Sequence, residues 1–122
     1  MRLIMIALTM LTATTYAQTE QQNLAQIADE LAGCAVTTGD SETYHSEFTR
    51  ITTQFLEGDR TDIDEMTAPR FAHALETEIL NPTVSYLWGM TTESYTEAFT
   101  AHPEINPKKY IAGCVERLKS LK

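Results

Sequence analysis

Apolar residues recur every three or four positions along most of this chain, which is the spacing that places them on one face of a helix. We find no stretch in which apolar and polar residues alternate as they do in a half-buried strand. The pattern predicts an all-α fold, a small helical bundle of about four main helices, with the third element broken around Pro69.

Glycine and capping residues mark the limits of the first two predicted helices. Gly39 stops the first apolar stripe, because glycine readily adopts the left-handed conformation that ends a helix. Asp40 or Ser41 is the expected N-cap of the second helix, which ends at Gly58.

The third predicted helix contains a proline. Asp62 and Glu65 form a pair that resembles a capping box, so the helix is expected to start near Asp62. Pro69 either follows a short turn or bends this helix, because proline cannot donate a hydrogen bond to the preceding turn. The expected buried residues are Phe71, Ala72, Leu75 and Ile79.

Two further helix starts are marked by the dipeptides Asn81-Pro82 and Asn106-Pro107. Each places an N-cap residue before a proline in the first helical position. The fourth helix is expected to bury Val84, Leu87, Trp88, Thr91, Tyr95, Ala98 and Phe99, and the last helix Ile111, Cys114, Val115, Leu118 and Leu121.

The first 17 residues have the order of a secretory signal peptide. Arg2 supplies the charged start, an apolar run follows over residues 3–11, and small residues stand at Thr15 and Ala17. This order predicts cleavage after Ala17 and a single helical domain over residues 18–122. The apolar run is shorter than the roughly 20 residues that span a bilayer, so we expect a periplasmic or extracellular protein.

Two cysteines, Cys34 and Cys114, lie on the apolar stripes of the first and last predicted helices. A bundle readily places two such helices side by side, and an exported protein folds in an oxidising compartment. We therefore expect a disulfide between Cys34 and Cys114 that joins the terminal helices. In the chain-entropy model, closing a loop of this length removes roughly 4.5 kcal/mol of unfolded-state freedom.

The predicted mature chain is strongly acidic. Without the first 17 residues it has 8 basic and 17 acidic residues, a net charge of −9. Such a surface repels phosphate backbones and anionic lipids, which argues against nucleic-acid and membrane partners. It suits a partner protein with a basic surface.

One face of the fourth predicted helix is less polar than expected. Tyr86 and Met90 lie about 160° from the stripe centred on Trp88, at about 100° per residue. Aromatic residues and methionine are enriched at interfaces, although scattered exposed side chains or cover from a loop would also explain them. The predicted partner-binding residues on this face are Tyr86, Met90, Glu93 and Glu97.

Two Glu/His pairs have the spacing of metal ligands on a helix, Glu42 with His45 and His73 with Glu76. A di-iron bundle needs two such motifs in the same order and two more carboxylates, whereas the second pair is reversed. The acidic segment 57–65 departs from the calcium-loop pattern. No haem-attachment, nucleophile-elbow or phosphate-loop motif occurs. We therefore predict no metal, no cofactor and no enzymatic activity.

The segments Leu31-Ala32-Gly33-Cys34-Ala35 and Ile111-Ala112-Gly113-Cys114, with the signal-like start, resemble a loose class of small exported bacterial proteins. Members of that class are all-helical and have one cysteine on the first helix and one on the last. The resemblance implies the helical fold, export and the disulfide, and it implies no activity.

These features favour a non-enzymatic exported binding protein that contacts another protein or a small ligand. One form is an immunity-type inhibitor, whose negative surface covers the basic active-site cleft of a toxin. The alternatives are a periplasmic stress chaperone, which partly unfolds at low pH, and a helical metal or haem protein or enzyme.

Overall fold

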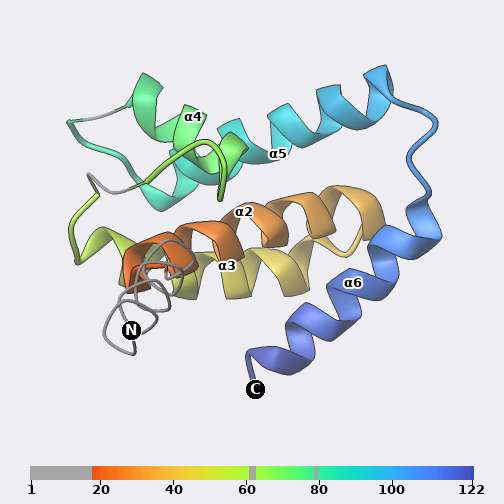
Figure 1. The fold of residues 1–122 in the computed structure, drawn as a ribbon, viewed down its shortest axis with the longest axis horizontal. Helices are drawn as coiled ribbons and strands as arrows, with labels where there is room; N and C mark the ends of the chain where they lie inside the picture. Colours follow the sequence, from red (N-terminus) through yellow and green to blue (C-terminus); the bar gives the residue numbers. More distant parts are fainter. Residues whose placement is uncertain (1–17, 61–62, 79) are drawn as a thin grey trace, which may run out of the picture.

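The computed structural model describes residues 18–60, 63–78 and 80–122, which form five helices and no strand (Figure 1). The all-α prediction is confirmed, but the expected number of helices is one too low, because the short element at Pro69 is a complete helix. The predicted signal peptide lies outside the described residues. Within them, no helix is long and apolar enough to cross a bilayer. The helices are α2 (Glu20–Thr38), α3 (Ser41–Leu56), α4 (Pro69–Thr77), α5 (Val84–Ala101) and α6 (Pro107–Ser120).

Side-chain caps fix most of the helix starts. Asp40 accepts a hydrogen bond from a backbone N–H of α3, and Asn106 accepts one at the start of α6, as predicted. The start of α5 differs from the prediction, because Thr83 is its N-cap and accepts from the N–H of Tyr86. The predicted cap Asn81 therefore lies two residues before the actual N-cap.

The third predicted helix also begins later than expected. Residues 65–67 form a turn closed by the Asp64 carboxylate, which accepts two backbone hydrogen bonds. The helix α4 then starts at Pro69, in the first helical position, where the missing N–H of proline does no harm. The predicted cap Asp62 and the predicted core residue Ile79 lie outside the described residues.

The helix α2 is central to the fold. It packs against α3, α4, α5 and α6, and α5 also contacts α3 and α4 (Figure 1). Gly39 ends α2 in the left-handed conformation, with φ of 75°, so that the chain turns back into α3. Aromatic rings fill the space between these helices: Phe48 packs edge-on against Phe71 and Trp88, with centroids 6.0 and 5.0 Å away.

The helix α6 is the least buried. It packs mainly against α2, and its first turn also meets α5, where the ring of Tyr110 packs against that of Phe99. Cys114 is buried, whereas Ile111 and Val115 are 36% and 45% exposed, and Leu118 and Leu121 are half-buried. The prediction that Ile111 and Val115 are buried is wrong, because α2 covers one side of α6 and α5 meets only its first turn, so this helix buries a narrow stripe.

Candidate functional site

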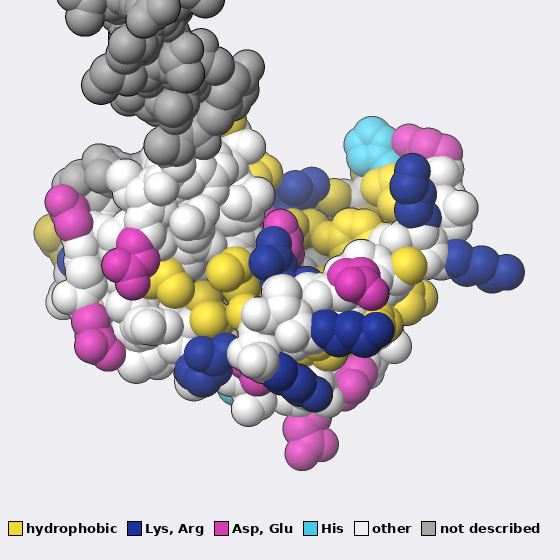
Figure 2. All heavy atoms as spheres, turned by 60° about the horizontal axis from the view of Figure 1, so that its bottom comes forward, with side chains coloured by type: hydrophobic (Ala, Val, Ile, Leu, Met, Phe, Trp, Pro, Cys, Tyr) yellow, Lys and Arg dark blue, Asp and Glu magenta, His cyan; other side chains and the backbone are white. Residues whose placement is uncertain are grey.

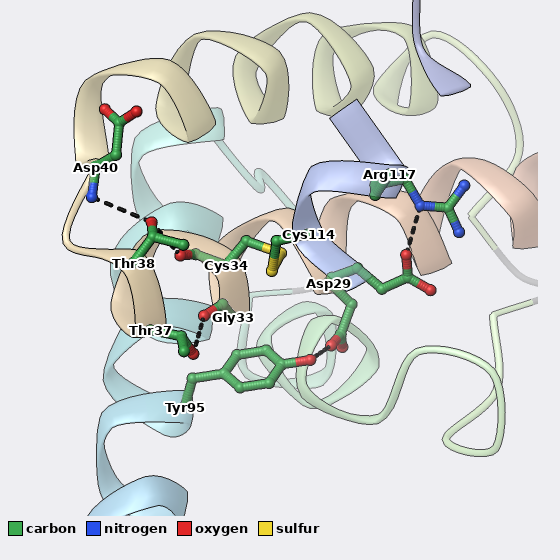
Figure 3. Close-up of a disulfide and its surroundings, with 10 residues drawn as sticks. Asp29, Gly33, Cys34, Thr37, Thr38, Asp40, Tyr95, Cys114 and Arg117 are labelled. Carbon is green, nitrogen blue, oxygen red and sulfur yellow. Dashed lines mark hydrogen bonds and ion pairs between the residues drawn. A yellow bond between two sulfur atoms is a disulfide. The ribbon is translucent and has the colours of Figure 1, made fainter. Parts of the chain in front are cut away.

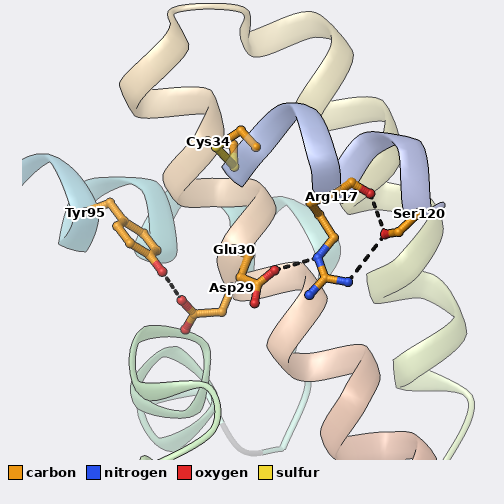
Figure 4. A network of polar contacts seen from close by, with 7 residues as sticks. Asp29, Glu30, Cys34, Tyr95, Arg117 and Ser120 are labelled. Carbon is orange, nitrogen blue, oxygen red and sulfur yellow. Dashed lines mark hydrogen bonds and ion pairs between the residues drawn. A yellow bond between two sulfur atoms is a disulfide. The ribbon is translucent and has the colours of Figure 1, made fainter. Parts of the chain in front are cut away.

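The predicted disulfide between Cys34 and Cys114 is confirmed, and it joins α2 to α6 (Figure 3). Both cysteines are buried, and their Cα atoms lie 5.7 Å apart. One turn further along α6, the Nε of Arg117 donates to the Glu30 carboxylate of α2 at 2.6 Å (Figure 4). A covalent bond and a charged hydrogen bond therefore hold α6 on the central helix.

A groove of about 660 Å³ lies between α2 and α6. Ile105, Tyr110 and the disulfide give it an apolar wall. Gly113 also lines it, and a Cβ at this position would meet no other atom within 4 Å, so the groove is open there. The volume falls within the range of about 300–1,000 Å³ that is typical of small-molecule sites.

The charged residues that line the groove differ in whether they form ion pairs. Glu30 pairs with Arg117, and Glu116 lies 3.6 Å from the Nζ of Lys119. Lys109 makes no ion pair within the described part of the chain. One uncommitted positive charge thus stands beside an apolar wall, which suits a ligand with an apolar body and an anionic group.

A buried carboxylate on α2, Asp29, fastens α4 and α5 to the central helix. Its Oδ2 accepts hydrogen bonds from the backbone N–H groups of Arg70 and Phe71, both at 2.8 Å. Its Oδ1 accepts one from the Tyr95 hydroxyl (Figure 4). Because Ala68 stands at the N-cap position of α4 and has no polar side chain, Asp29 caps α4 from another helix.

Burial decides the protonation behaviour of this cluster. It raises the pKa of the Asp29 carboxyl, and the hydrogen bonds from Tyr95, Phe71 and Arg70 offset this only in part. Burial also raises the pKa of the Tyr95 and Tyr110 hydroxyls, and the Asp29 charge adds to both shifts. Both tyrosines therefore remain hydrogen-bond donors at neutral pH. Asp29 and Tyr95 are 3% and 8% exposed, so this cluster is a structural clamp rather than an open site.

Gly33 lets the two tyrosines lie close to α2. A Cβ at this position would overlap the Tyr110 hydroxyl and would stand 2.7 Å from the Cε1 of Tyr95. Phe99 packs against both rings, with centroids 5.8 Å from Tyr95 and 5.3 Å from Tyr110. The absence of a side chain at Gly33 thus allows α5 and the start of α6 to approach the central helix.

The structure separates the four predicted partner-binding residues into two kinds. Tyr86 and Met90 are half-buried and pack against the core, and the Tyr86 hydroxyl lies 2.8 Å from that of Thr77. Glu93 and Glu97 are exposed. A binding role for this face stays a prediction, and its two large side chains have a packing role that the sequence did not reveal.

The three histidines are exposed, and none lines the groove. The predicted pair of His73 and Glu76 lies 3.9 Å apart on the surface of α4, and His102 lies 2.9 Å from Glu104. The described residues contain no group of three or more His, Cys, Asp or Glu side chains that could hold a metal ion.

Sequence reasoning missed three residues that shape this region: Asp29, Gly33 and Lys109. A signal for Asp29 did exist, because a helix that starts at Pro69 after an alanine needs an acceptor from elsewhere in the chain. The role of Gly33 depends on tyrosines from two other helices, so no local pattern marks it.

No protein-family model, curated protein or solved structure matches this chain. Function is therefore inferred from the residues of the site.

Proposed function

We propose that this protein is an exported, non-enzymatic binding protein that holds a small ligand in the groove between α2 and α6. The groove itself carries the proposal, since it combines a volume of about 660 Å³ with a mostly apolar wall. A fatty acid has the matching chemistry. The wall at Ile105 and Tyr110 would bury its chain, and Lys109 would pair with its carboxylate.

Two observations support the other parts of this proposal. A disulfide such as Cys34–Cys114 persists in oxidising compartments, which agrees with the signal-like start of the chain. In the groove, the Ser120 hydroxyl donates to the backbone carbonyl of Arg117 at 2.6 Å rather than to a general base. This wall therefore favours binding over nucleophilic catalysis.

Titration calorimetry with dodecanoate tests the proposal. Gly113→Leu fills the open part of the groove and should weaken dodecanoate binding by about tenfold or more, a change of about 1.4 kcal/mol or more. Ala112→Leu adds similar bulk to an exposed position next to it and is the matched control, so its affinity should equal that of the wild type. Wild-type protein that does not bind dodecanoate, or equal binding by Gly113→Leu, would contradict the proposal.

A second variant tests the contribution of the ligand's carboxylate separately from that of its apolar chain. Lys109→Met removes the uncommitted charge and leaves the apolar wall in place. It should weaken the binding of dodecanoate and leave that of dodecanol unchanged. Equal weakening of both ligands would mean that Lys109 acts on the shape of the groove rather than on the anionic group.

An immunity-type inhibitor is the second candidate, and the charge of the body favours it. Residues 18–106 contain 16 acidic and 3 basic residues. A surface of this kind is complementary to the basic cleft of a toxin and would accelerate their association. This candidate predicts one tight protein partner, captured from the native periplasm, whose association rate falls with salt and does not respond to dodecanoate.

The stress-chaperone alternative requires unfolding at low pH, whereas protonation of Asp29 favours the folded state. Because burial raises its pKa, the folded protein binds this proton more tightly than the unfolded chain does, so acid favours folding at this group. Circular dichroism through the acidic range tests this alternative, which a loss of helix would favour. Elemental analysis and an absorption scan test the metal or haem alternative.

A further inference from the structure

The charges of this molecule are divided between α6 and the rest of the chain. Residues 107–122 contain five basic residues, including all four lysines of the protein, and one acidic residue, Glu116. Residues 18–106 contain 3 basic and 16 acidic residues. Basic side chains accordingly gather, interleaved with apolar ones, on the side of the molecule that α6 forms (Figure 2). The last helix is a basic element on an acidic body.

One flank of α6 is exposed along its whole length. Its residues follow one another at intervals of three and four, so they share one face of the helix. At its centre, Ile111 and Val115 are 36% and 45% exposed, and no residue of this flank lines the groove. We call this flank the α6 stripe, and it consists of Lys108, Ile111, Val115 and Lys119, with Lys122 just beyond the end of the helix.

A surface of the opposite character lies toward the other end of the molecule, where α3 ends and α4 begins (Figure 1). It is a hollow of about 560 Å³ whose lining includes four acidic side chains and one arginine. Its floor is apolar, with Ile63 half-buried and Ala72 and Leu75 buried. We call it the acidic hollow, and the carboxylates used below are Asp64, Glu65 and Glu76.

We propose that the α6 stripe docks into the acidic hollow of a second copy of this chain. The lysines of the stripe would meet the carboxylates of the rim, and Ile111 and Val115 would meet the apolar floor. Within one molecule these surfaces do not meet, because α6 packs against neither α3 nor α4, the two described helices that border the hollow. A second copy is the occupant that the chain itself supplies, because one copy carries the basic stripe and the other the complementary acidic hollow.

The two surfaces differ, so the contact is head-to-tail. Each bound copy keeps one stripe or one hollow unoccupied, and assembly continues until a ring closes or a short chain forms. This self-association goes beyond the proposed function, since neither surface includes the ligand groove. Dodecanoate binding and self-association can therefore succeed or fail separately.

Analytical ultracentrifugation of the disulfide-bonded protein tests the proposal. At low salt the weight-average mass should exceed that of the monomer and should rise with protein concentration. It should fall to the monomer value at about 1 M salt, where the Debye length is about 3 Å. A monomer at every concentration, or an association that salt does not change, would overturn the proposal. So would a monomer that binds vesicles of anionic phospholipid instead.

Two variants identify the surfaces. The stripe variant, Ile111→Gln with Val115→Gln, removes the apolar centre and keeps a residue type that favours helix. The hollow variant, Glu65→Lys with Glu76→Lys, reverses the charge of the rim. Each alone should be monomeric, with an unchanged circular dichroism spectrum.

Mixing the two variants gives the sharpest result. The stripe variant keeps its hollow and the hollow variant keeps its stripe, so the mixture should form a heterodimer and nothing larger. A mixture that stays monomeric, or either variant that still self-associates, would overturn the assignment of the surfaces.

Matched controls separate these surfaces from the net charge. Glu42→Lys with Glu104→Lys makes the same charge change at exposed positions on α3 and in the loop before α6, and it should leave self-association unchanged. Ala101→Gln does the same for a polar change at an exposed apolar position on α5. Loss of self-association in either control would mean that the contact lies outside the stripe and the hollow.

Discussion

The body formed by α2, α3, α4 and α5 is held together differently from the terminal helix α6. In the body, rings with no exposed surface, such as those of Phe48 and Phe55, pack against Phe71. In α6, Cys114 is the buried apolar residue, and Ile111 stays partly in water. Stabilisation by burial grows with apolar area, so the body folds by its core while α6 depends on its attachment to α2.

A small protein of this kind can place a binding surface on a helix that contributes little to its core. A helix that is fixed by a disulfide does not need to bury all its apolar residues, and it can keep them exposed beside cations. Two of the three surfaces to which we assign binding, the groove and the α6 stripe, involve this attached helix, and the acidic hollow lies on the body. The buried carboxylate of the body, Asp29, is used within the fold instead.

The largest expected effect contrasts one core residue with one residue of α6. Phe48→Ala should lower the free energy of unfolding by about 3–5 kcal/mol, because it leaves a cavity among buried rings. Val115→Ala, at a position 45% exposed, should change it by no more than about 0.5 kcal/mol. Urea denaturation followed by circular dichroism measures both. Similar losses at the two positions would show that α6 packs as tightly as the body.

Removing the covalent attachment should have the next largest effect. Cys34→Ala with Cys114→Ala should lower the free energy of unfolding by about 2–5 kcal/mol, because the unfolded chain regains the freedom of an 80-residue loop. Hydrogen exchange should show where: the amides of α6 lose protection, and those of α3 and α5 keep it. An equal loss of protection in all helices would mean that α6 and the body unfold as one unit.

The link between the terminal helices could be predicted from sequence, because it follows from local pattern. Cys34 and Cys114 lie on apolar stripes, and Asn106 before Pro107 marks the start of α6. Each of these signals lies within one turn of a helix, so a single sequence is enough to find it.

The exposure of α6 and the role of Asp29 could not be predicted in this way. Periodicity shows which face of a helix is apolar, but not how much of it the neighbouring helices cover. Ile111 and Val115 are exposed because α2 covers one side of α6 and α5 meets only its first turn. Asp29 caps a helix that begins 40 residues further along the chain. The groove depends on how α6 lies on α2, an arrangement in space of which local pattern gave no sign.

A smaller effect is expected from adding a side chain at Gly33, where two tyrosines lie close to α2. Gly33→Ala should lower the free energy of unfolding by about 1–3 kcal/mol, because the added methyl group overlaps the rings of Tyr95 and Tyr110. Combining it with Tyr110→Phe, which removes the nearest atom, should cost less than the sum of the single changes in a double-mutant cycle.

Gly113→Ala is the matched control on α6. Its methyl group would meet no neighbour within 4 Å, so better helix propensity should raise stability by about 0.5–1 kcal/mol. A loss of stability at Gly113, or none at Gly33, would contradict the difference in packing between the two helices.

The smallest expected effect is the pH dependence that Asp29 gives to the free energy of unfolding. Its pKa in the folded protein is raised above the ordinary value of 3.8, so the stabilisation tied to its proton is complete below 3.8 and is lost as the pH rises through the folded-state pKa. Asp29→Asn does not titrate. The free energy of unfolding of the wild type minus that of Asp29→Asn should therefore fall as the pH rises through this window.

Asp64 supplies the control of opposite sign. Its exposed carboxyl accepts hydrogen bonds from the N–H groups of Thr67 and Met66, which lower its pKa below 3.8. Stabilisation at Asp64 is thus present above 3.8 and is lost as the pH falls through the folded-state pKa, so the difference from Asp64→Asn should rise with pH. Urea denaturation of the wild type and both variants across the acidic range measures the two slopes. If the difference in the free energy of unfolding between the wild type and Asp29→Asn also rises with pH, the hydrogen bonds that cap α4 outweigh burial. The clamp then favours the charged carboxylate.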